Sequence, residues 1–422
     1  MRHRQSEYRK IDYLTIAIYA VIVIFGWANI YAAGYNEAHS AVFDFNFNHC
    51  KQLVWIGVSA LVAGLILLTD LRFFSNGAYI FYAISMLLLL SVLFVGSSTN
   101  GGISWIDLKF FKLQPSEFAK FATALALSKY VSKQDFDIHQ RGSWLMLGLI
   151  IALPVGLIFL QHDMGSALVF ASFLIPLYRF GMTPYILVIG VVAITLFVLT
   201  IAVGDSYYII MISLAVIGLI YLFVWLNRPR RKDYVRTIGI FAVCCLFIIS
   251  VDTVFGSLEV HQQNRIKVLL DPSLDLRGTG YNVHQAKIAI GSGGFKGKGF
   301  LNGTITKANF LPEQETDFIF CTVGEEWGFV GCLLLLGLYL WLLQRLVSIS
   351  ERQASRFSRF YGYSVSAILF FHILVNVGMV IGLVPVIGIP LPFFSYGGSS
   401  LLAFTILLFI LLRQDAEHTS LL

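Results

Sequence analysis

The side chains that could carry out chemistry are concentrated in one polar stretch of the sequence, from about residue 260 to residue 331. It contains Asp271 and Asp275 in turn-forming surroundings, a glycine-rich run from Gly291 to Gly299, and a series of carboxylates that ends at Glu326. Long apolar segments precede and follow this stretch. A polar loop of this length in such a sequence is typical of a functional segment. We predict that residues 256–316 form a large loop over the outer face of a membrane protein and carry its active site.

Several ionisable residues lie within or beside apolar segments, where a charge is costly and usually marks an ion pair, a path or a site. Glu117 and Lys120 are three residues apart on one helical face, so they could form an interfacial ion pair or belong to a site. Asp163 could belong to a site or simply cap the helix that follows it. Asp317 and Glu325 would point in the same general direction from one helix, which favours a functional role over packing.

The polar loop is also rich in basic residues, although its glycine run matches neither standard phosphate-binding motif. Lys298 is followed by Gly299 rather than by Ser or Thr, and no G-x-G-x-x-G pattern fits the run. The run by itself therefore indicates a tight turn. Positive charge in a long outer loop nevertheless suits an anionic partner such as a lipid phosphate. The basic residues of this loop are Arg265, Lys267, Arg277, Lys287, Lys296, Lys298 and Lys307.

The composition sets the class of protein. Of the 422 residues, 57% are hydrophobic and only 13% are charged, whereas charged residues make up about 25% of an ordinary globular protein. The sequence therefore predicts one all-α polytopic membrane domain over residues 1–422 and excludes an ordinary soluble protein. Unbroken apolar runs of about 20 residues are typical of membrane helices rather than barrel strands. The twelve predicted spans cover residues 13–33, 53–69, 78–96, 116–131, 144–161, 165–181, 185–203, 207–226, 236–255, 317–346, 360–384 and 398–413.

The distribution of Lys and Arg predicts the orientation, because these residues accumulate in loops on the cytoplasmic side. With the N-terminus inside, the basic residues of alternate loops all lie on that side, including the cluster from Arg228 to Arg236. Both chain ends are then cytoplasmic, and the 256–316 loop precedes the tenth span on the outside, where no ATP is available. We therefore expect no nucleotide cofactor. The net charge of +6 comes largely from such orientation signals, so it does not indicate binding to nucleic acid.

Motifs along nearly the whole chain resemble those of the SEDS family (shape, elongation, division and sporulation). In the loop region they are Leu270-Asp271-Pro272 with Asp275, the run from Gln285 to Gly299, Phe310-Leu311-Pro312-Glu313 with Thr316-Asp317-Phe318, and Gly324-Glu325-Glu326. Elsewhere they are Trp105 with Gln114-Pro115-Ser116-Glu117 and Lys120, Gln161 with Asp163, and the run from Gly382 to Ser399. The sequences of these motifs resemble the rod-shape branch of the family more closely than its division branch.

The sequence also departs from the family pattern. The family usually has about ten spans, and this chain has two more in the region 185–255. An added pair of spans leaves the side on which the large loop emerges unchanged. His162 stands where the family usually has proline, and Leu276 follows Asp275 where the family commonly has proline. The second change loosens a turn that would position Asp275.

The resemblance implies peptidoglycan glycosyltransfer during cell elongation, at the outer face of the bacterial cytoplasmic (inner) membrane. The disaccharide of lipid II would be joined to a glycan carried on undecaprenyl pyrophosphate. The essential loop aspartate of the family corresponds to Asp275, whose implied role is general base for the 4-hydroxyl of the acceptor sugar. A positioned carboxylate contributes about 10²–10⁴-fold to such a step. The implied partner is a class B penicillin-binding protein, a transpeptidase, and the lipid tail implies a groove open to the membrane lipids.

The leaving group would be a lipid pyrophosphate, so the site also needs positive charge or a divalent cation, Mg²⁺ or Mn²⁺. Asp275 and Glu325 are the expected ligands if a cation is used. The residues predicted to bind substrate are Trp105, Glu117, Lys120, Asp163, Arg265, Lys267, Arg277, Gln285, Asp317, Glu325 and Ser395.

Two other functions compete with this interpretation. A flippase that carries lipid II outward would use the same lipid groove, but it would place polar residues through the full membrane depth and would not need Asp275. The in-span acids cluster toward the predicted outer side, except Asp252 and His372, whose depth the sequence does not fix. A non-enzymatic scaffold of the wall-synthesis complex would need the charge of the loop but not its carboxylate. The alternatives therefore differ over Asp275.

Overall fold

The computed structural model describes residues 11–35, 47–99, 102–108, 111–186, 279–307 and 313–421, with a few others (45, 188–190, 192, 196, 245–246, 248–251, 253 and 263). The chain divides into two compact units, residues 1–182 with 285–422, and residues 183–284. All contacts discussed below lie within the first unit. The prediction of a single membrane domain over residues 1–422 stays a prediction.

The described part of the chain is mostly helical, as predicted. Seven of its helices are long and apolar enough to cross a membrane, which agrees with the predicted class of polytopic helical membrane protein. These seven are α2 (Tyr13–Ala33), α3 (Asn48–Leu68), α4 (Leu71–Val95), α6 (Arg141–Leu160), α15 (Gly328–Arg352), α16 (Arg356–Val380) and α17 (Gly398–Leu421).

Shorter elements complete the bundle. Helix α5 (Pro115–Val131) is buried along most of its length, and α7 (Met164–Val169), the 3₁₀ turn η1 (Phe170–Phe173) and α8 (Leu174–Arg179) follow one another without a break. Helices α13 (Thr279–Gly293) and α14 (Ile319–Glu326) lie in and after the predicted outer loop. The antiparallel sheet of β1 (Ser97–Thr99), β2 (Gly102–Asp107) and β3 (Lys112–Leu113) connects α4 to α5.

Nine of the twelve predicted spans fall on described helices. The other three, between residues 185 and 255, lie almost entirely outside the described residues. The prediction of one helix from residue 317 to 346 is wrong, because α14 ends at Glu326 and α15 begins at Gly328. Gly328 has a φ of +64°, which interrupts the right-handed helix. The break lets Phe329 N–H donate to the carbonyl of Gly294 at 3.0 Å, so the glycine-rich turn docks on the start of α15.

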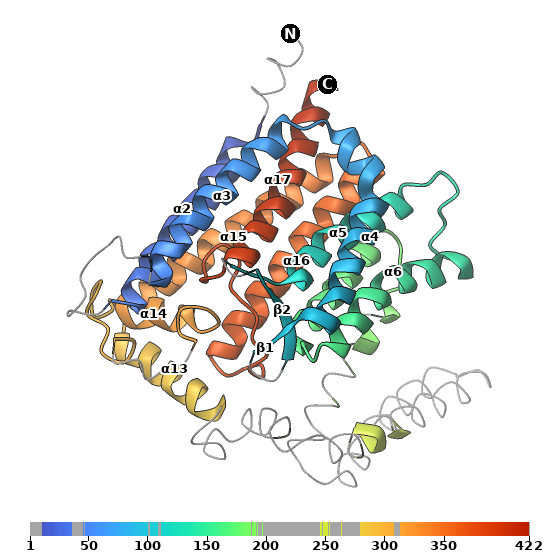
Figure 1. Cartoon of the computed structure of the whole chain (residues 1–422). Helices are drawn as coiled ribbons and strands as arrows, with labels where there is room; N and C mark the ends of the chain where they lie inside the picture. The colour runs from blue at the N-terminus through green and yellow to red at the C-terminus, as the bar shows by residue number, and fades with distance from the viewer. Residues whose placement is uncertain are drawn as a thin grey trace, which may run out of the picture. The chain divides into compact units, whose positions relative to one another are not determined.

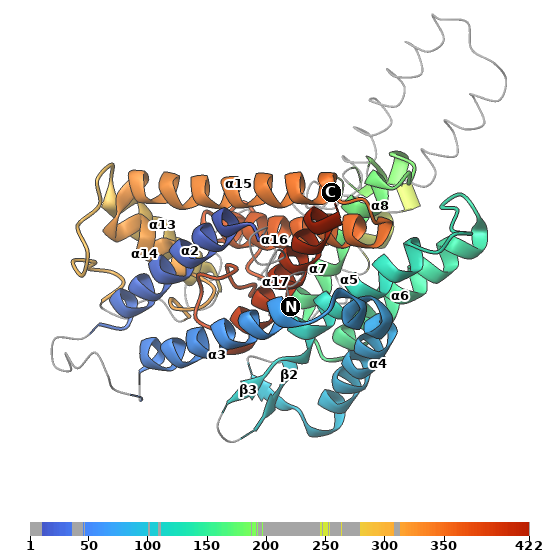
Figure 2. The same cartoon turned by 90° about the horizontal axis from the view of Figure 1, so that it is seen from above.

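Helix termini from distant parts of the sequence come together at the two opposite ends of the first unit, which we call the sheet end and the basic end (Figures 1 and 2). At the sheet end, Ser399 Oγ donates to the carbonyl of Lys112 at 2.9 Å, and Gly397 N–H donates to Gln52 Oε1 at 3.3 Å. The opposite, basic end carries the arginines and lysines that the sequence places on one side of the membrane. Those described there are Arg72, Lys129, Lys133, Arg141, Arg179, Arg345, Arg352, Arg356 and Arg359.

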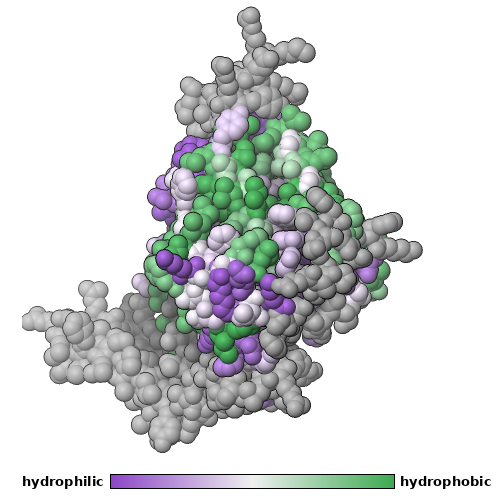
Figure 3. All heavy atoms as spheres, turned by 90° about the vertical axis from the view of Figure 1, so that its left-hand side faces the viewer, coloured by the Kyte–Doolittle hydropathy of each residue, from purple (hydrophilic) through white to green (hydrophobic). Residues whose placement is uncertain are grey.

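Burial separates inner helices from outer ones. The apolar windows of α16 and α17 are 78% and 89% buried, whereas that of α3 is 22% buried. Figure 3 shows apolar side chains over much of one outer face of the molecule. An outer helix of a membrane protein faces lipid tails, so its exposed Leu, Ile and Phe side chains are in an apolar solvent.

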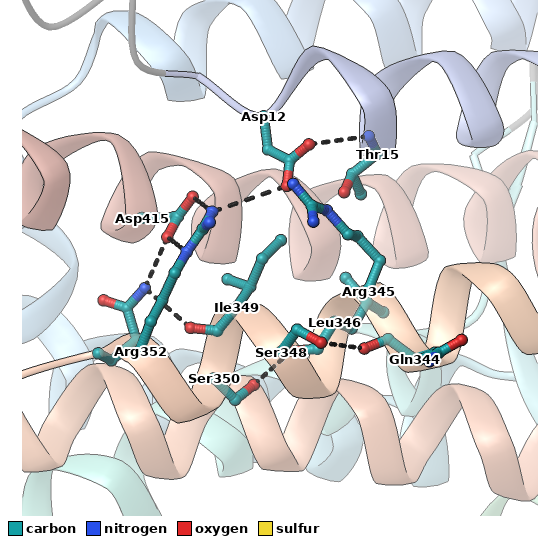
Figure 4. Close-up of polar contacts among 11 residues, drawn as sticks. Asp12, Thr15, Gln344, Arg345, Leu346, Ser348, Ile349, Ser350, Arg352 and Asp415 are labelled. Atoms are coloured by element: carbon teal, nitrogen blue, oxygen red, sulfur yellow. Dashed lines mark hydrogen bonds and ion pairs between the residues drawn. The ribbon is translucent and has the colours of Figure 1, made fainter.

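Ion pairs tie three helix ends together at the basic end, where Figure 4 shows two acids and two arginines pointing toward one another. Arg345 Nε lies 2.8 Å from Asp12 Oδ2, just before α2. Arg352 donates from Nε to Asp415 Oδ1 at 2.7 Å and also contacts Asp12 at 3.6 Å. Gln353 Nε2 donates to Asp415 Oδ1 at 3.0 Å. These contacts join the start of α2 to the last turns of α15 and α17.

Candidate functional site

A cluster of polar side chains at the sheet end joins the start of α5 to the start of α7. Asp163 accepts hydrogen bonds from Ser166 N–H at 3.0 Å and from Ser166 Oγ at 2.8 Å, so it caps α7 as one of the two alternatives predicted. Gln114 Nε2 donates at 3.1 Å to Asp163 Oδ2, the oxygen that also accepts Ser166 Oγ. Ser116 Oγ donates to Ser166 Oγ at 3.2 Å. The cap is therefore also part of a network that includes the start of α5.

One turn further along α5, Glu117 and Lys120 form a buried ion pair. Lys120 Nζ lies 2.7 Å from Glu117 Oε1, and each side chain is only 2% exposed. The ion pair predicted from the spacing of the two residues is therefore confirmed, and it is buried within the protein. Lys120 Nζ also lies 2.9 Å from Nε2 of His372 on α16. A charged pair this deep in the protein is costly unless its partners are well placed. We call the cluster of Glu117, Lys120 and His372 the polar centre.

The same face of α16 also makes hydrogen bonds to the backbone of residues 389–390, in the segment that precedes α17. His372 Nδ1 lies 3.2 Å from the carbonyl of Pro390. One turn later, Asn376 Nδ2 donates to the carbonyls of Ile389 at 2.7 Å and Asp317 at 2.9 Å. Ser395 is 3% exposed and its Oγ accepts the N–H of Leu391 at 2.8 Å, so it shapes this segment. Its predicted role in binding substrate stays a prediction.

Asp317 lies in the turn before α14, at the edge of this centre. The carboxylate is packed against Gly388, whose φ is +76°. Burial, together with the negative charges of Glu313 and Asp163, raises the pKa of Asp317 to about 7. A carboxyl group with a pKa in this range can exchange a proton near neutral pH. The negative charge of Asp163 thus acts on Asp317, although less than burial does.

Glu325 is placed elsewhere, which corrects the expectation that it shares a helix face with Asp317. Its Oε1 accepts from Lys298 Nζ at 2.7 Å, Thr304 N–H at 2.8 Å and Ile305 N–H at 3.0 Å. Its Oε2 accepts from the N–H and Oγ1 of Thr306 at 3.0 and 2.9 Å. Burial alone would raise the pKa of Glu325, but these hydrogen bonds lower it to about 2. Glu325 therefore binds the loop 298–306 to α14.

The carboxylate of Glu325 does not fit a metal ligand, because its oxygens are occupied by donors of the protein itself. No group of three or more His, Cys, Asp or Glu side chains that could hold a metal ion occurs in the part of the chain that the structure describes. The other predicted ligand, Asp275, lies outside that part, as do Arg265, Lys267 and Arg277.

The remaining predicted residues that the structure describes lie on two other elements. Trp105 lies in β2, half-buried, and its carbonyl accepts Ser97 Oγ at 3.3 Å. Gln285 lies in α13, half-buried. Sequence reasoning missed Asn376, and it left the depth of His372 open. The signal that could have found them is their spacing, since two polar residues four apart on an apolar helix share a face.

Comparison with known proteins agrees with this arrangement. The family described as cell cycle protein, which comprises FtsW, RodA and SpoVE, matches residues 12–228 and 212–420. The peptidoglycan glycosyltransferase MrdB of Escherichia coli K12 is 33% identical over 331 residues, which are 78% of this chain and 75% of that protein. The peptidoglycan glycosyltransferase RodA of Treponema pallidum is 31% identical over 412 residues, 92% and 94% of the two chains.

A solved structure, described as structural coordination of polymerization and crosslinking by a peptidoglycan synthase complex, has a chain of similar fold. Its TM-score is 0.71 at 28% sequence identity, and the match covers 97% of this chain and 98% of that chain. The match to the family extends from the first membrane helix to the last, and it includes every element that builds the polar centre at the sheet end. The chain therefore belongs to the FtsW, RodA and SpoVE family, the SEDS proteins.

Proposed function

We propose that the chain is a peptidoglycan glycosyltransferase that polymerises lipid II into glycan strands at the outer face of the cytoplasmic membrane during cell elongation. The observation that carries the proposal is membership of the family over the whole chain, together with relatives that are named as enzymes of this activity. The basic residues gathered at one end support the orientation, because that end would face the cytoplasm. The sheet end, with its buried polar centre, would then face outward.

In the proposed reaction, the 4-hydroxyl oxygen of the acceptor sugar attacks the anomeric carbon of the lipid-linked donor. The bond from that carbon to the diphosphate oxygen breaks, and undecaprenyl diphosphate leaves. Asp275 takes the proton of the attacking hydroxyl as general base. In the proposal, four groups at the sheet end bind or orient the polar head of the lipid substrate: Glu117, Lys120, Asp163 and Asp317.

The diphosphate leaving group requires positive charge facing it. The proposed sources are Arg265, Lys267, Arg277 and Lys120, with Mg²⁺ or Mn²⁺ held by Asp275 as a further source. A bound divalent cation would neutralise the diphosphate as it departs. Removal of divalent cations by a chelator should then abolish polymerisation, and adding back Mg²⁺ or Mn²⁺ should restore it. Full activity after chelation would remove the cation from the proposal.

The proposed partner is a class B penicillin-binding protein, a transpeptidase that cross-links the new strand. A related fold occurs in a complex that couples polymerization to crosslinking, which supports this choice. Co-purification of the chain with such a transpeptidase from detergent-solubilised membranes tests it. Recovery of the chain alone, under conditions that preserve other membrane complexes, would count against the partner.

The deciding experiment incubates the purified protein, with and without the transpeptidase, with lipid II. We expect polymer with the wild type and none with Asp275→Asn, while Asp271→Asn, four residues earlier in the same loop, retains activity. Polymer of equal length from Asp275→Asn would exclude the general-base role. A wild type that moves lipid II across vesicles without polymerising it would favour a flippase. A wild type that does neither but stimulates the transpeptidase would favour a scaffold.

A further inference from the structure

His372 on α16 is a buried side chain to which nothing above assigns a role. It is 1% exposed, and its two ring nitrogens have different partners. Nδ1 lies 3.2 Å from the carbonyl oxygen of Pro390, and Nε2 lies 2.9 Å from Lys120 Nζ. A carbonyl oxygen only accepts hydrogen bonds, so Nδ1 carries the ring proton and Nε2 presents a lone pair. His372 is therefore an acceptor for the ammonium group of Lys120.

The ammonium group is held from three sides by three different helices. Glu117 Oε1 accepts on α5 at 2.7 Å, and His372 Nε2 accepts on α16 at 2.9 Å. On the third side, Lys120 Nζ lies 4.8 Å from the ring centroid of Phe404 on α17, within range of a cation–π interaction. The His372 ring meets the same Phe404 ring edge to face, with centroids 4.8 Å apart. A flexible lysine stem is thus fixed at one point of the polar centre.

The charges around the Lys120 ammonium group explain why it needs His372 as a partner. The second carboxylate oxygen, Glu117 Oε2, is buried and has no hydrogen-bond partner among the described residues. Lys120 also interacts electrostatically with Asp163, the acid that caps α7. Without His372 as acceptor, the Lys120 ammonium group would still be attracted by Glu117 and Asp163 but would lose its hydrogen-bond partner on α16. Its position relative to the substrate would then no longer be defined.

We infer that His372 is a positioning residue for glycosyl transfer. Its Nε2 accepts a hydrogen bond from the Lys120 ammonium group and so fixes that group between α5, α16 and α17. This inference rests on the proposed function, in which Lys120 faces the polar head of the lipid substrate. His372 does not touch the substrate. Its contribution passes through Lys120, so the two residues act as one unit.

The test measures initial rates of lipid II polymerisation by the full-length protein with its transpeptidase. His372→Leu removes the acceptor and should slow the reaction about tenfold or more, the usual effect of losing a hydrogen bond to a charged group. His372→Gln can still accept from Lys120 through Oε1 and donate to Pro390, so it should stay within about threefold of the wild type. Adding Lys120→Met to His372→Leu should slow the reaction no further than Lys120→Met alone.

The matched control is Tyr361→Phe, also on α16. It removes the buried hydrogen bond from Tyr361 Oη to the carbonyl of Leu407 at 3.1 Å, which joins α16 to α17 without involving Lys120. Its polymerisation rate should stay close to that of the wild type. If His372→Leu does not give folded protein, His372→Asn takes its place, because that side chain is too short to reach both partners and should be as slow.

Wild-type rates for both His372→Leu and His372→Asn would overturn the inference, as would a Gln variant as slow as the Leu variant. Equal slowing by Tyr361→Phe would show that looser packing of α16 explains the loss, and would also overturn it. So would a double variant whose loss is the product of the two single losses. A wild type without polymerase activity would instead sink the proposed function, so the two failures are distinguishable.

Discussion

Lys298 and Glu325 are joined twice. The backbone N–H of Lys298 donates to the carbonyl of Glu325 at 3.0 Å, and its side-chain ammonium lies 2.7 Å from the Glu325 carboxylate. The two residues therefore fasten the glycine-rich turn after α13 to the end of α14. The junction therefore holds the end of α13 against the start of α15.

Replacing Glu325 should destabilise the protein. The carboxylate is fully buried and satisfies three backbone N–H groups, two hydroxyls and one ammonium group. Glu325→Ala leaves these donors without a partner, at a cost of about 3 kcal/mol or more. Thermal unfolding in detergent should show a clear loss relative to Glu351→Gln, a control on an exposed carboxylate at the basic end. Equal melting temperatures would contradict this account of the junction.

The same carboxylate should make the protein sensitive to acid. Its folded pKa of about 2 lies below the ordinary value of 4.5. The stability that it contributes is therefore complete above about pH 4.5 and is lost as the pH falls toward 2. Melting temperatures between pH 6 and pH 3 should fall less steeply for Glu325→Gln than for the wild type. Parallel pH profiles would show that the carboxylate is not ionised in the folded state.

The neighbouring Glu326 should have the opposite pH dependence. Burial raises its pKa to about 7, with the charge of Glu325 adding to this effect and the backbone of Leu301 and Gly303 opposing it. A raised pKa means that the folded state holds the proton more tightly, so the contribution to stability is lost as the pH rises from about 4.5 through 7. Glu326→Gln should remove this loss. The measurement is the difference in melting temperature between pH 5.5 and pH 7.5 for the two proteins.

Two facing glycines at this junction should tolerate no side chain. Gly297 and Gly328 have φ values of +79° and +64°, and a Cβ on Gly297 would overlap the carbonyl of Glu326. A Cβ on Gly328 would overlap the backbone N of Gly297. Gly297→Ala and Gly328→Ala should therefore each destabilise the protein by several kcal/mol. Gly294→Ala is the matched control, because its φ is +56° and its Cβ would meet open space, so only the strain of about 1 kcal/mol remains.

The membrane helices were predictable because apolar length alone defines them. The break at Gly328 was not, since glycine is common within membrane helices and the cause is a turn about 30 residues earlier in the sequence. The sequence also showed that Glu325 is unusual, but a buried charge marks a loop anchor as readily as a substrate site. Only the donors around the carboxylate distinguish these roles. The Glu117–Lys120 pair could be predicted from spacing, whereas its third partner, His372, is 252 positions away.

The ion pair between Arg352 and Asp415 at the basic end should contribute to the stability of the protein (Figure 4). Asp415 is fully buried, whereas the Arg352 side chain is 42% exposed, so solvent screens part of the attraction. Asp415→Asn should destabilise the protein by about 2 kcal/mol, and Arg352→Met should by itself cost less. Because each change removes the same contact, the double variant should be more stable than the sum of the single losses predicts, by about 1 kcal/mol. Thermal unfolding of the four proteins gives this coupling, and strictly additive losses would show that the contact of Asp415 with Gln353, rather than with Arg352, holds α17 against α15.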